Sequence, residues 1–205
     1  AQVTKRAKSL GMPAIAITDH GNMYGAVAFY DACVKNGIKA IFGTEFYVCD
    51  DLTVKSGKTK LNHLILLVKN QEGYNNISLL NAVAFRDGFY YKPRIDFKTL
   101  KEHHEGLICT SACIGGEIPQ AILNGRCDEA ESLILEYREV FGDDFYLEIQ
   151  NHGLKEELAV NAKLREFSKK YGIKLVATND VHYVKKEDAV AQDVLLCVQT
   201  QADYD

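Results

Sequence analysis

No apolar run in this chain of 205 residues approaches the roughly 18–20 residues of a membrane span, and no signal-peptide pattern opens it. Basic residues are not in excess either, since 24 Lys and Arg stand against 28 Asp and Glu, for a net charge of −4. A domain that held duplex DNA by its phosphates alone would be basic, so broad electrostatic binding of DNA is not supported. An acidic balance suits a site that collects divalent cations.

The six cysteines form no Cys-x-x-Cys pair and no spacing typical of a disulfide framework. Most lie in apolar runs, as in 107-LICTSAC-113 and 195-LLCVQ-199. This usage indicates a reducing compartment, and we expect a cytoplasmic protein without membrane contacts. The sequence also lacks a Ser-His-Asp order, a Walker loop and a GxGxxG motif.

Short apolar runs alternate with helix-like segments along the chain. The runs fit strands buried on both faces, and the segments between them repeat apolar residues at intervals of three and four. Repeated units of this kind predict one α/β domain with a mainly parallel sheet, either open or closed into a barrel. The expected strands are residues 14–18, 40–48, 63–68, 107–111, 145–149 and 174–178. The expected helices are residues 3–11, 24–37, 72–85, 127–142, 155–172 and 186–201.

Three polar features have a structural interpretation. Residues 50–62, polar and rich in lysine, predict a mobile loop. Arg94 is interpreted as a surface residue paired with Asp96 or a neighbour rather than as a phosphate ligand. His103 and His104, at the end of a polar helix-like stretch, are interpreted as solvated.

Residues able to bind metals follow several of the predicted strands. In parallel α/β folds ligands bind beyond the carboxyl ends of the strands, because loops and helix N-termini converge there. His63 is an exception, since it opens its strand, and it requires an opposite strand sense or a different boundary. The candidates are Asp19, His20, Glu45, His63, Cys113, Asn151, His152, Asp180 and His182.

Each candidate has a simpler interpretation when taken alone. An Asp-His pair after a strand is more often a cap and turn, and Cys113 alone suggests a small buried apolar side chain. Glu45 inside an apolar strand is harder to explain, because an unpaired buried carboxylate destabilises the fold. Random surface polarity would scatter such residues over both ends of the sheet. Their gathering at one end therefore favours a shared metal site.

The donor types indicate which metals would bind. Imidazoles, carboxylates and one thiolate suit zinc, manganese or iron better than an all-oxygen calcium or magnesium cage. Such a site supports hydrolysis, because the metal lowers the pKa of bound water and polarises a phosphoryl or carbonyl oxygen. A weaker signal is the pair Gly115–Gly116 leading to Glu117, which suggests an anion-binding turn at a helix N-terminus.

Several stretches resemble the PHP (polymerase and histidinol phosphatase) domain family. They are 13-PAIAITDHGNMYGAVAFYDAC-33, 43-GTEFYV-48, 110-TSACIGGEIPQAIL-123 and 176-VATNDVHY-183. Three more narrow the resemblance to the PHP domain of bacterial DNA polymerase III alpha subunits, and with them it covers essentially the whole chain. These are 88-GFYYKPRID-96, 141-FGDDFYLEIQNHG-153 and 187-EDAVAQDVLLCVQT-200.

The resemblance implies a distorted, TIM-like βα barrel of seven strands with a cluster of up to three metal ions at the strand ends. It implies that Asp19 is a neighbour of the cluster rather than a ligand, and it transfers no ligand role to His152. The ligands carried over residue by residue are His20, Glu45, His63, Cys113, Asp180 and His182.

The family's first strand carries a His-x-His pair and then an Asp, all ligands, and this chain begins downstream of them. The resemblance therefore implies that residues 1–205 are an N-terminally truncated PHP domain of a larger polymerase chain, lacking its first strand. About nine ligands are implied for the intact site, of which up to three are missing here. The remaining six either hold one or two ions weakly or leave a partly empty pocket.

The implied function is that of the PHP domain of a replicative DNA-directed DNA polymerase, with a phosphoesterase site that uses zinc, manganese or iron. The activity would be a metal-dependent 3′–5′ exonuclease. One alternative is a non-catalytic domain that supports the polymerase and docks partners, and a less favoured one is a small-molecule phosphatase of the histidinol phosphate type. The implied partners are DNA, through the parent polymerase, and the other domains and subunits of the holoenzyme. The chain alone would not polymerise DNA.

Overall fold

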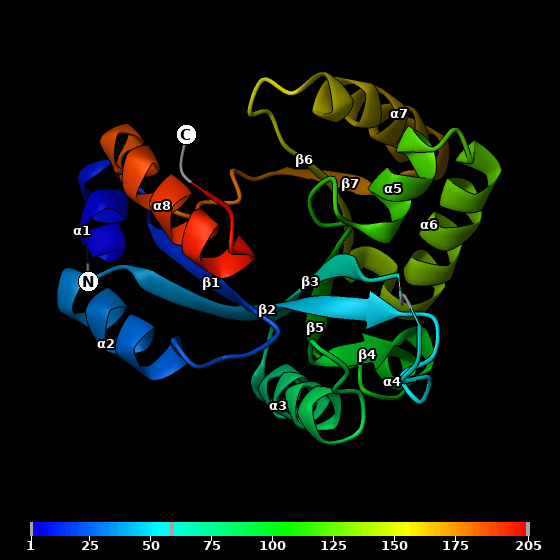
Figure 1. Ribbon diagram of the computed structural model, residues 1–205, viewed down its shortest axis with the longest axis horizontal. Helices are drawn as coiled ribbons and strands as arrows, with labels where there is room; N and C mark the ends of the chain where they lie inside the picture. Colours follow the sequence, from blue (N-terminus) through cyan, green and yellow to red (C-terminus); the bar gives the residue numbers. More distant parts are fainter. Residues whose placement is uncertain (1, 58–59, 204–205) are drawn as a thin grey trace.

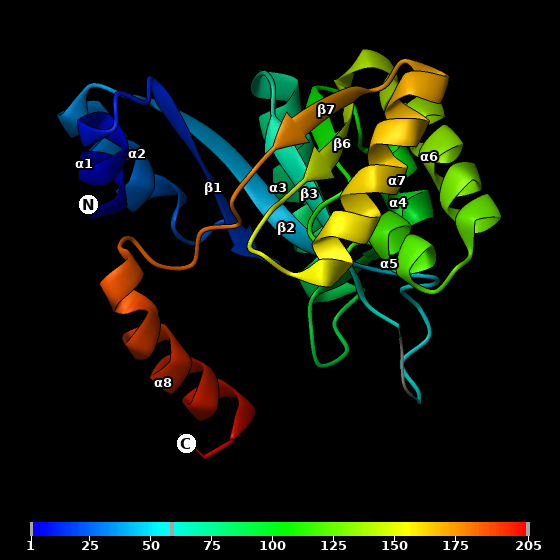
Figure 2. The same ribbon diagram turned by 90° about the horizontal axis from the view of Figure 1, so that it is seen from above.

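A computed structural model describes residues 2–57 and 60–203 of the chain. Within this part a curled sheet stays open on one side, between β1 and β7, and helices surround it (Figures 1 and 2). The helices α1 and α2 lie beside β1 and β2, α3 lies against β3, and α7 lies against β6. The fold is a mixed α/β half-barrel, in agreement with the predicted class.

The described residues form seven strands. Six follow the order β1-β2-β3-β5-β6-β7, and the short β4 pairs with β2. Four pairings are parallel, whereas β3 runs antiparallel to both β2 and β5. All six predicted strands are present, and β4 was missed because it has only three residues. The strands are β1 (Ala14–His20), β2 (Lys39–Cys49), β3 (Asn62–Val68), β4 (Arg94–Asp96), β5 (Leu107–Thr110), β6 (Phe145–Ile149) and β7 (Lys174–Ala177).

The direction of β3 accounts for the position of His63. In the sheet register Tyr47 pairs with His63, and Glu45 pairs with both His20 and Ile65. Because β3 runs opposite to β2, its first residues lie beside the last residues of β2. The opposite strand sense, and not a different boundary, places His63 at the end of the sheet where the other candidates lie.

Capping signals mark several helix ends. The helices α2 and α7 end at Gly37 and Gly172, both with φ of 64° and with a backbone N–H bonded back into the last turn. The side chain of Asn70 accepts a hydrogen bond from Gly73 N and caps α3. The helices are α1 (Gln2–Ser9), α2 (Ala26–Asn36), α3 (Gln71–Arg86), α4 (Phe97–Glu102), α5 (Glu117–Leu123), α6 (Cys127–Phe141), α7 (Lys155–Tyr171) and α8 (Ala189–Thr200). Two 3₁₀ turns, η1 (Gly142–Asp144) and η2 (Lys186–Asp188), precede β6 and α8.

The apolar core lies on the side of the molecule that contains β2, β3, β5 and β6. Leu66 and Leu147 of the sheet, Ile77 of α3 and Ile134 of α6 are all fully buried there. The edge strands β1 and β7 are only partly covered. None of the helices in the described part is long and apolar enough to cross a membrane. All six cysteines are free thiols.

The interpretation of Arg94 as a surface residue is wrong. Its side chain is fully buried, and Nε donates a hydrogen bond to the carbonyl oxygen of Gly88 at 2.8 Å. Nη2 donates to the carbonyl oxygens of Leu52 and Val54 at 3.2 and 3.1 Å. Arg94 thus ties part of the predicted loop 50–62 to β4, while residues 58–59 of that loop lie outside the described residues.

The prediction of two solvated histidines holds only in part. His103 and His104 are both partly buried, just after α4. The ring of His104 packs edge-on against Phe141 with centroids 5.8 Å apart, and its Nδ1 lies 2.8 Å from the carbonyl oxygen of Lys101. An apolar neighbour from a distant helix is not visible in the local sequence.

Candidate metal centre

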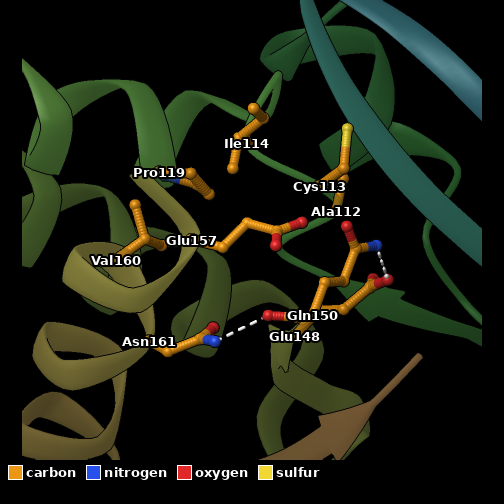
Figure 3. Close-up of a pocket in the computed structure, with 9 residues that line it drawn as sticks. All are labelled: Ala112, Cys113, Ile114, Pro119, Glu148, Gln150, Glu157, Val160 and Asn161. Atoms are coloured by element: carbon orange, nitrogen blue, oxygen red, sulfur yellow. Dashed lines mark hydrogen bonds between the residues drawn. The ribbon is translucent and has the colours of Figure 1, made fainter. Parts of the chain in front are cut away.

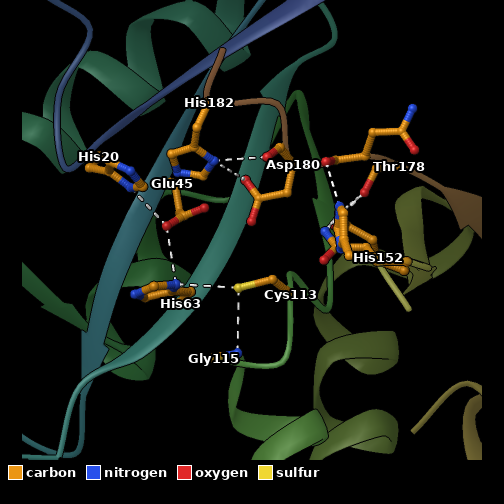
Figure 4. A network of polar contacts seen from close by, with 12 residues as sticks. His20, Glu45, His63, Cys113, Gly115, His152, Thr178, Asp180 and His182 are labelled. Atoms are coloured by element: carbon orange, nitrogen blue, oxygen red, sulfur yellow. Dashed lines mark hydrogen bonds and ion pairs between the residues drawn. The ribbon is translucent and has the colours of Figure 1, made fainter. Parts of the chain in front are cut away.

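The six predicted ligands lie together at one end of the sheet (Figure 4). They come from separate elements: the ends of β1 and β3, the middle of β2, the loop between β5 and α5, and the loop after β7. Figure 4 shows their polar groups pointing toward one another. The residues are His20, Glu45, His63, Cys113, Asp180 and His182.

Glu45 is the centre of the strand-borne half of this cluster. Its residue is 3% exposed, and its Oε1 lies 2.9 Å from His20 Nδ1 and 3.1 Å from His63 Nδ1. Burial raises the pKa of Glu45, but the hydrogen bond to His20 and the nearby imidazoles outweigh it, so that the pKa is lowered overall. The same hydrogen bond raises the pKa of His20. Within the described residues, imidazoles are the only groups in ion-pair contact with this buried carboxylate.

Cys113 extends this half from the β5–α5 loop. Its Sγ lies 3.5 Å from His63 Nδ1 and accepts a hydrogen bond from Gly115 N at 3.4 Å. Burial raises the pKa of the Cys113 thiol to about 11, and the charge of Glu45 contributes to the rise. The thiol is therefore protonated near neutral pH unless a cation displaces the proton. The preceding residue, Ala112, has a φ of 59°.

Asp180 and His182 form the loop-borne half. His182 Nδ1 lies 2.8 Å from the carbonyl oxygen of Asp180 and 3.8 Å from its Oδ1. The rings of His182 and His20 have centroids 5.5 Å apart, which joins the two halves. Asp180 adopts a φ of 43°, a conformation that L-residues rarely take and that concentrates at functional sites.

The donor set fits zinc, manganese or iron, but the side chains do not form a ready-made coordination shell. Two ligands of one tetrahedral zinc ion are about 3.4–3.8 Å apart, given the usual bond lengths. The contacts of Glu45, His63 and Cys113 are near or slightly below this spacing. Yet among the described residues no group of three or more His, Cys, Asp or Glu side chains is arranged to hold an ion. The ligand atoms instead hydrogen-bond one another, so binding would require them to turn toward a common point.

Asp19 shapes the loop beside the cluster. Its Oδ2 accepts a hydrogen bond from Gly25 N at 2.9 Å, and a Cβ on Gly25 would lie only 2.7 Å from that oxygen. The carboxylate therefore closes the turn that follows His20. This contact fits the predicted place of Asp19 beside the ligands.

His152, to which no ligand role was transferred, connects the loop-borne half to α7. Its Nδ1 lies 2.5 Å from Glu157 Oε1, and its Nε2 lies 2.8 Å from the carbonyl oxygen of Asn179. Both partners are acceptors, which favours a doubly protonated ring. The hydrogen bond with Glu157 raises the pKa of His152, and the Asn179 carbonyl adds to it. Through its hydrogen bond to the Asn179 carbonyl, His152 holds Asn179, the residue before Asp180, in place.

Sequence reasoning missed a second buried carboxylate, Glu148 of β6. It accepts hydrogen bonds from the hydroxyls of Thr110 and Thr178 and, at 3.0 Å, from Gln150 Nε2. These bonds join β5, β6 and the end of β7 behind the cluster. An acidic residue inside the apolar run 145-FYLEI-149 is the same signal that singled out Glu45, and it would have identified Glu148.

Three cavities adjoin the cluster, one of them of about 420 Å³ beside His152, Asp180 and His182. A small one of about 10 Å³ lies behind Cys113, between the polar residues Glu148, Gln150, Glu157 and Asn161 and the apolar residues Ala112, Ile114, Pro119 and Val160 (Figure 3). A larger one of about 550 Å³ fills the hollow of the half-barrel, with His20, Glu45, Cys113, Asp180 and His182 in its lining. The ligand cluster therefore faces a hollow large enough for a small substrate or the end of a chain.

The fold and the cluster define an α/β half-barrel with candidate metal ligands at its strand ends. A model of the PHP domain family matches residues 1–152. The chain therefore belongs to the PHP domain family. The matched range includes His20, Glu45, His63 and Cys113 but ends before Asp180 and His182.

The chain is similar along nearly its whole length to alpha subunits of DNA polymerase III. It is 48% identical to that of Borreliella burgdorferi, over 98% of this chain and 18% of the relative. It is 49% identical to that of Thermus aquaticus, over 94% of this chain and 16% of the relative. The chain thus spans less than a fifth of the length of the curated relatives it matches.

Two solved structures share the fold at low sequence identity. One is an amidohydrolase from Chromobacterium violaceum with bound sulfate and no metal, with a TM-score of 0.55 and 14% identity over 88% of this chain and 81% of that one. The other, from Bifidobacterium adolescentis, is assigned as a metal-dependent phosphoesterase, with a TM-score of 0.54 and 14% identity over 95% of this chain and 89% of that one. At this identity the two structures support the fold alone.

Proposed function

We propose that this chain is the PHP domain of a DNA polymerase III alpha subunit and that its ligand cluster is a metal-dependent phosphoesterase site acting on DNA 3′ ends. The observation that carries the proposal is the convergence of six side chains of metal-ligand type from five separate segments, one of them the buried carboxylate of Glu45. Similarity to alpha subunits over nearly the whole chain supports the polymerase context. Polymerisation itself would belong to other parts of such a subunit, and the free thiols fit the cytoplasm.

The proposed ligands are His20, Glu45, His63, Cys113, Asp180 and His182, and the proposed metal is zinc or manganese, with iron as a further option. When bound, the metal would lower the pKa of a water molecule and polarise a phosphoryl oxygen. The chain's own residues have separate tasks. Glu45 keeps His20 and His63 oriented, Asp19 holds the adjoining loop, and the hollow admits the substrate.

A non-catalytic role remains the second candidate, because no three ligands are arranged to hold an ion in the described structure. In that role the cluster would stabilise the domain while other surfaces dock subunits of the holoenzyme. A phosphatase of the histidinol phosphate type has less support, since the similarity to polymerase subunits covers nearly the whole chain.

The test is a nuclease assay on the complete subunit, with a single-stranded DNA labelled at its 5′ end. Shortening from the 3′ end that requires manganese or zinc and is abolished by His182→Ala would support the phosphoesterase. Metal content is measured on the same samples. Full metal occupancy without hydrolysis would reject it in favour of the structural role.

A further inference from the structure

Three exposed aromatic side chains form a row beside the candidate metal centre. Tyr24 lies in the loop between β1 and α2, Phe85 in the last turn of α3, and Phe89 in the segment that leads to β4. The ring centroids of Tyr24 and Phe85 are 6.2 Å apart, and those of Phe85 and Phe89 are 6.3 Å apart at an angle of 21°. These residues are 81%, 39% and 48% exposed, in chain order. We call Tyr24, Phe85 and Phe89 the aromatic row.

The three rings adjoin one another, and this indicates a binding surface. Single exposed apolar side chains are common on any protein surface, whereas a contiguous group of exposed rings beside a candidate site is a candidate binding surface. Tyr91, two residues after Phe89, is a further exposed ring of the same segment, with 81% exposure and a φ of 59°. A bulky residue rarely adopts that conformation, and here it belongs to a tight turn closed by the hydrogen bond from Tyr90 N to the carbonyl oxygen of Lys92.

The row is physically connected to the metal centre. A Cβ on Gly21, the residue after His20, would lie 2.7 Å from Pro93 Cγ and 3.3 Å from the Tyr47 ring. The Tyr47 ring in turn meets the ring of His63 edge-on, with centroids 5.6 Å apart. The loop that carries Tyr24 and the segment that carries Phe89 therefore pack together on the His20 and His63 side of the centre.

A positive charge lies next to the segment that joins the row to the centre. Lys92 Nζ lies 5.5 Å above the Tyr47 ring. The Tyr47 ring also packs against the ring of His63, so Lys92 lies one aromatic ring away from a candidate ligand. A ligand that covers both the row and Lys92 must carry flat apolar groups and negative charge.

We propose that the aromatic row is a stacking platform for the bases of single-stranded DNA, and that Lys92 contacts a phosphate of the same strand where it enters the metal centre. The inference rests on the proposed function, because it names the substrate and its path to that site. Single strands have both features that the surface requires, whereas bases in a duplex are stacked inside and cannot reach the rings. A protein surface with an acidic side chain would also match the rings and Lys92, and the binding test separates it from DNA.

The charge balance indicates that base stacking contributes more to the DNA affinity than attraction to phosphates does. The chain has a net charge of −4, and the exposed Arg86 beside Phe85 is paired with Asp87, which leaves Lys92 as the cation available to a phosphate and makes the attraction weak. Stacking of one base on an aromatic ring is worth about a tenfold change in affinity or more. If Lys92 neutralises about one phosphate, a plot of log affinity against log salt concentration should have a slope near −1.

The binding test uses the purified chain in EDTA, so that no hydrolysis occurs. Fluorescence anisotropy of a 5′-labelled oligothymidylate is compared with that of an abasic oligomer of equal length. The variants are Phe85→Leu with Phe89→Leu, and Tyr24→Leu, because leucine keeps an apolar side chain and removes the flat ring. Tyr30→Leu is the matched control, since Tyr30 is exposed on α2 and pairs with Phe42 instead. Thermal melting confirms that every variant is folded.

We expect the double leucine variant to bind oligothymidylate about tenfold more weakly or worse, Tyr30→Leu to bind normally, and the abasic oligomer to bind weakly throughout. Equal binding of the abasic oligomer and oligothymidylate would overturn the inference. Unchanged DNA binding by the leucine variants would overturn it too. So would a loss of self-association in those variants without any effect on DNA, which would identify a protein-docking surface.

A second assay separates this inference from the proposed function. Metal-dependent hydrolysis of bis(p-nitrophenyl) phosphate, an ester too small to span the row, is measured in the same variants. Ring-dependent DNA binding without any hydrolysis by the wild type would reject the phosphoesterase and keep the platform. Hydrolysis together with ring-independent DNA binding would reject the platform and keep the phosphoesterase.

Discussion

The two halves of the candidate metal centre are fixed by different means. His20, Glu45 and His63 lie on three neighbouring strands, and the sheet register alone puts them side by side. Asp180 and His182 lie in a loop beyond β7, where Asp180 has a positive φ. The strand-borne half is part of the folded sheet, whereas the loop-borne half depends on side-chain contacts and on any bound metal.

This difference predicts which substitutions damage the fold and which damage only metal binding. The buried carboxylate of Glu45 is in contact with two imidazoles, so the metal-free protein already uses it. Asp180 and His182 are more exposed and contact each other. The strand-borne half should therefore matter in EDTA, and the loop-borne half only when metal is present.

The largest effect is expected for Glu45→Gln. The neutral amide cannot balance the imidazoles or serve as an anionic ligand. Bound zinc or manganese should be lost, and the free energy of unfolding in EDTA should fall by about 1–3 kcal/mol, the cost of breaking a buried hydrogen-bonded contact. Urea denaturation in EDTA and metal analysis after dialysis measure both effects. Glu166→Gln, on the exposed side of α7, is the matched control, and full metal occupancy in Glu45→Gln would show that Glu45 is not a ligand.

The second prediction concerns Asp180→Asn. Asparagine tolerates a positive φ, so the change removes the charge with little backbone strain. The variant should bind less metal, and its melting temperature with metal should fall toward that of the metal-free protein, because metal binding adds to stability. In EDTA its free energy of unfolding should stay within about 0.5 kcal/mol of the wild type. A loss in EDTA as large as that of Glu45→Gln would abolish the distinction between the two halves.

The third prediction concerns the pH dependence of the contact that holds the loop-borne half. The hydrogen bond with Glu157 raises the pKa of His152 above its ordinary value of 6.5, so this contribution is complete below pH 6.5 and is lost as the pH rises through the raised pKa. Burial raises the pKa of Glu157, but the hydrogen bonds from His152 lower it overall below 4.5. That contribution is complete above pH 4.5 and is lost as the pH falls through the lowered pKa.

The stability difference between the wild type and His152→Ala should therefore be largest between about pH 4.5 and 6.5 and should shrink on either side. Urea denaturation in EDTA across this range measures it. His104→Ala, which removes a partly buried histidine outside the centre, is the control. A difference that does not vary with pH would mean that His152 acts by packing alone.

The strand-borne half was largely predictable from the sequence. Apolar runs located β1, β2 and β3, and polar residues at their ends pointed to the cluster. The position of His63 at the start of its strand required either an opposite strand sense or a different boundary. The antiparallel register of β2 and β3 shows that the opposite sense is correct. The physical reason is that the apolar run of a buried strand is visible in the local sequence.

The contacts that complete the centre were not predictable in this way. His152 meets Asn179, and Glu148 meets Thr110, only because the chain returns to the same place after long intervals. The burial of Arg94 has the same origin, since its acceptors lie in distant loops. A polar side chain in a short or irregular segment gives no local sign of whether distant groups will cover it.

The smallest effect is expected for Gly115→Ala, which perturbs the strand-borne half from outside the sheet. The new Cβ would lie 3.0 Å from His63 Nδ1 and 3.3 Å from Cε1, so the ring must shift by a few tenths of an ångström. Competition with a chromophoric chelator should show metal affinity reduced a few-fold, with stability in EDTA nearly unchanged. Gly116→Ala should instead lower stability in EDTA, because its Cβ would lie 2.2 Å from the backbone oxygen of Ser111 and the backbone must shift. Unchanged affinity in Gly115→Ala would place His63 outside the coordination shell and reduce the ligands of the strand-borne half to His20, Glu45 and Cys113.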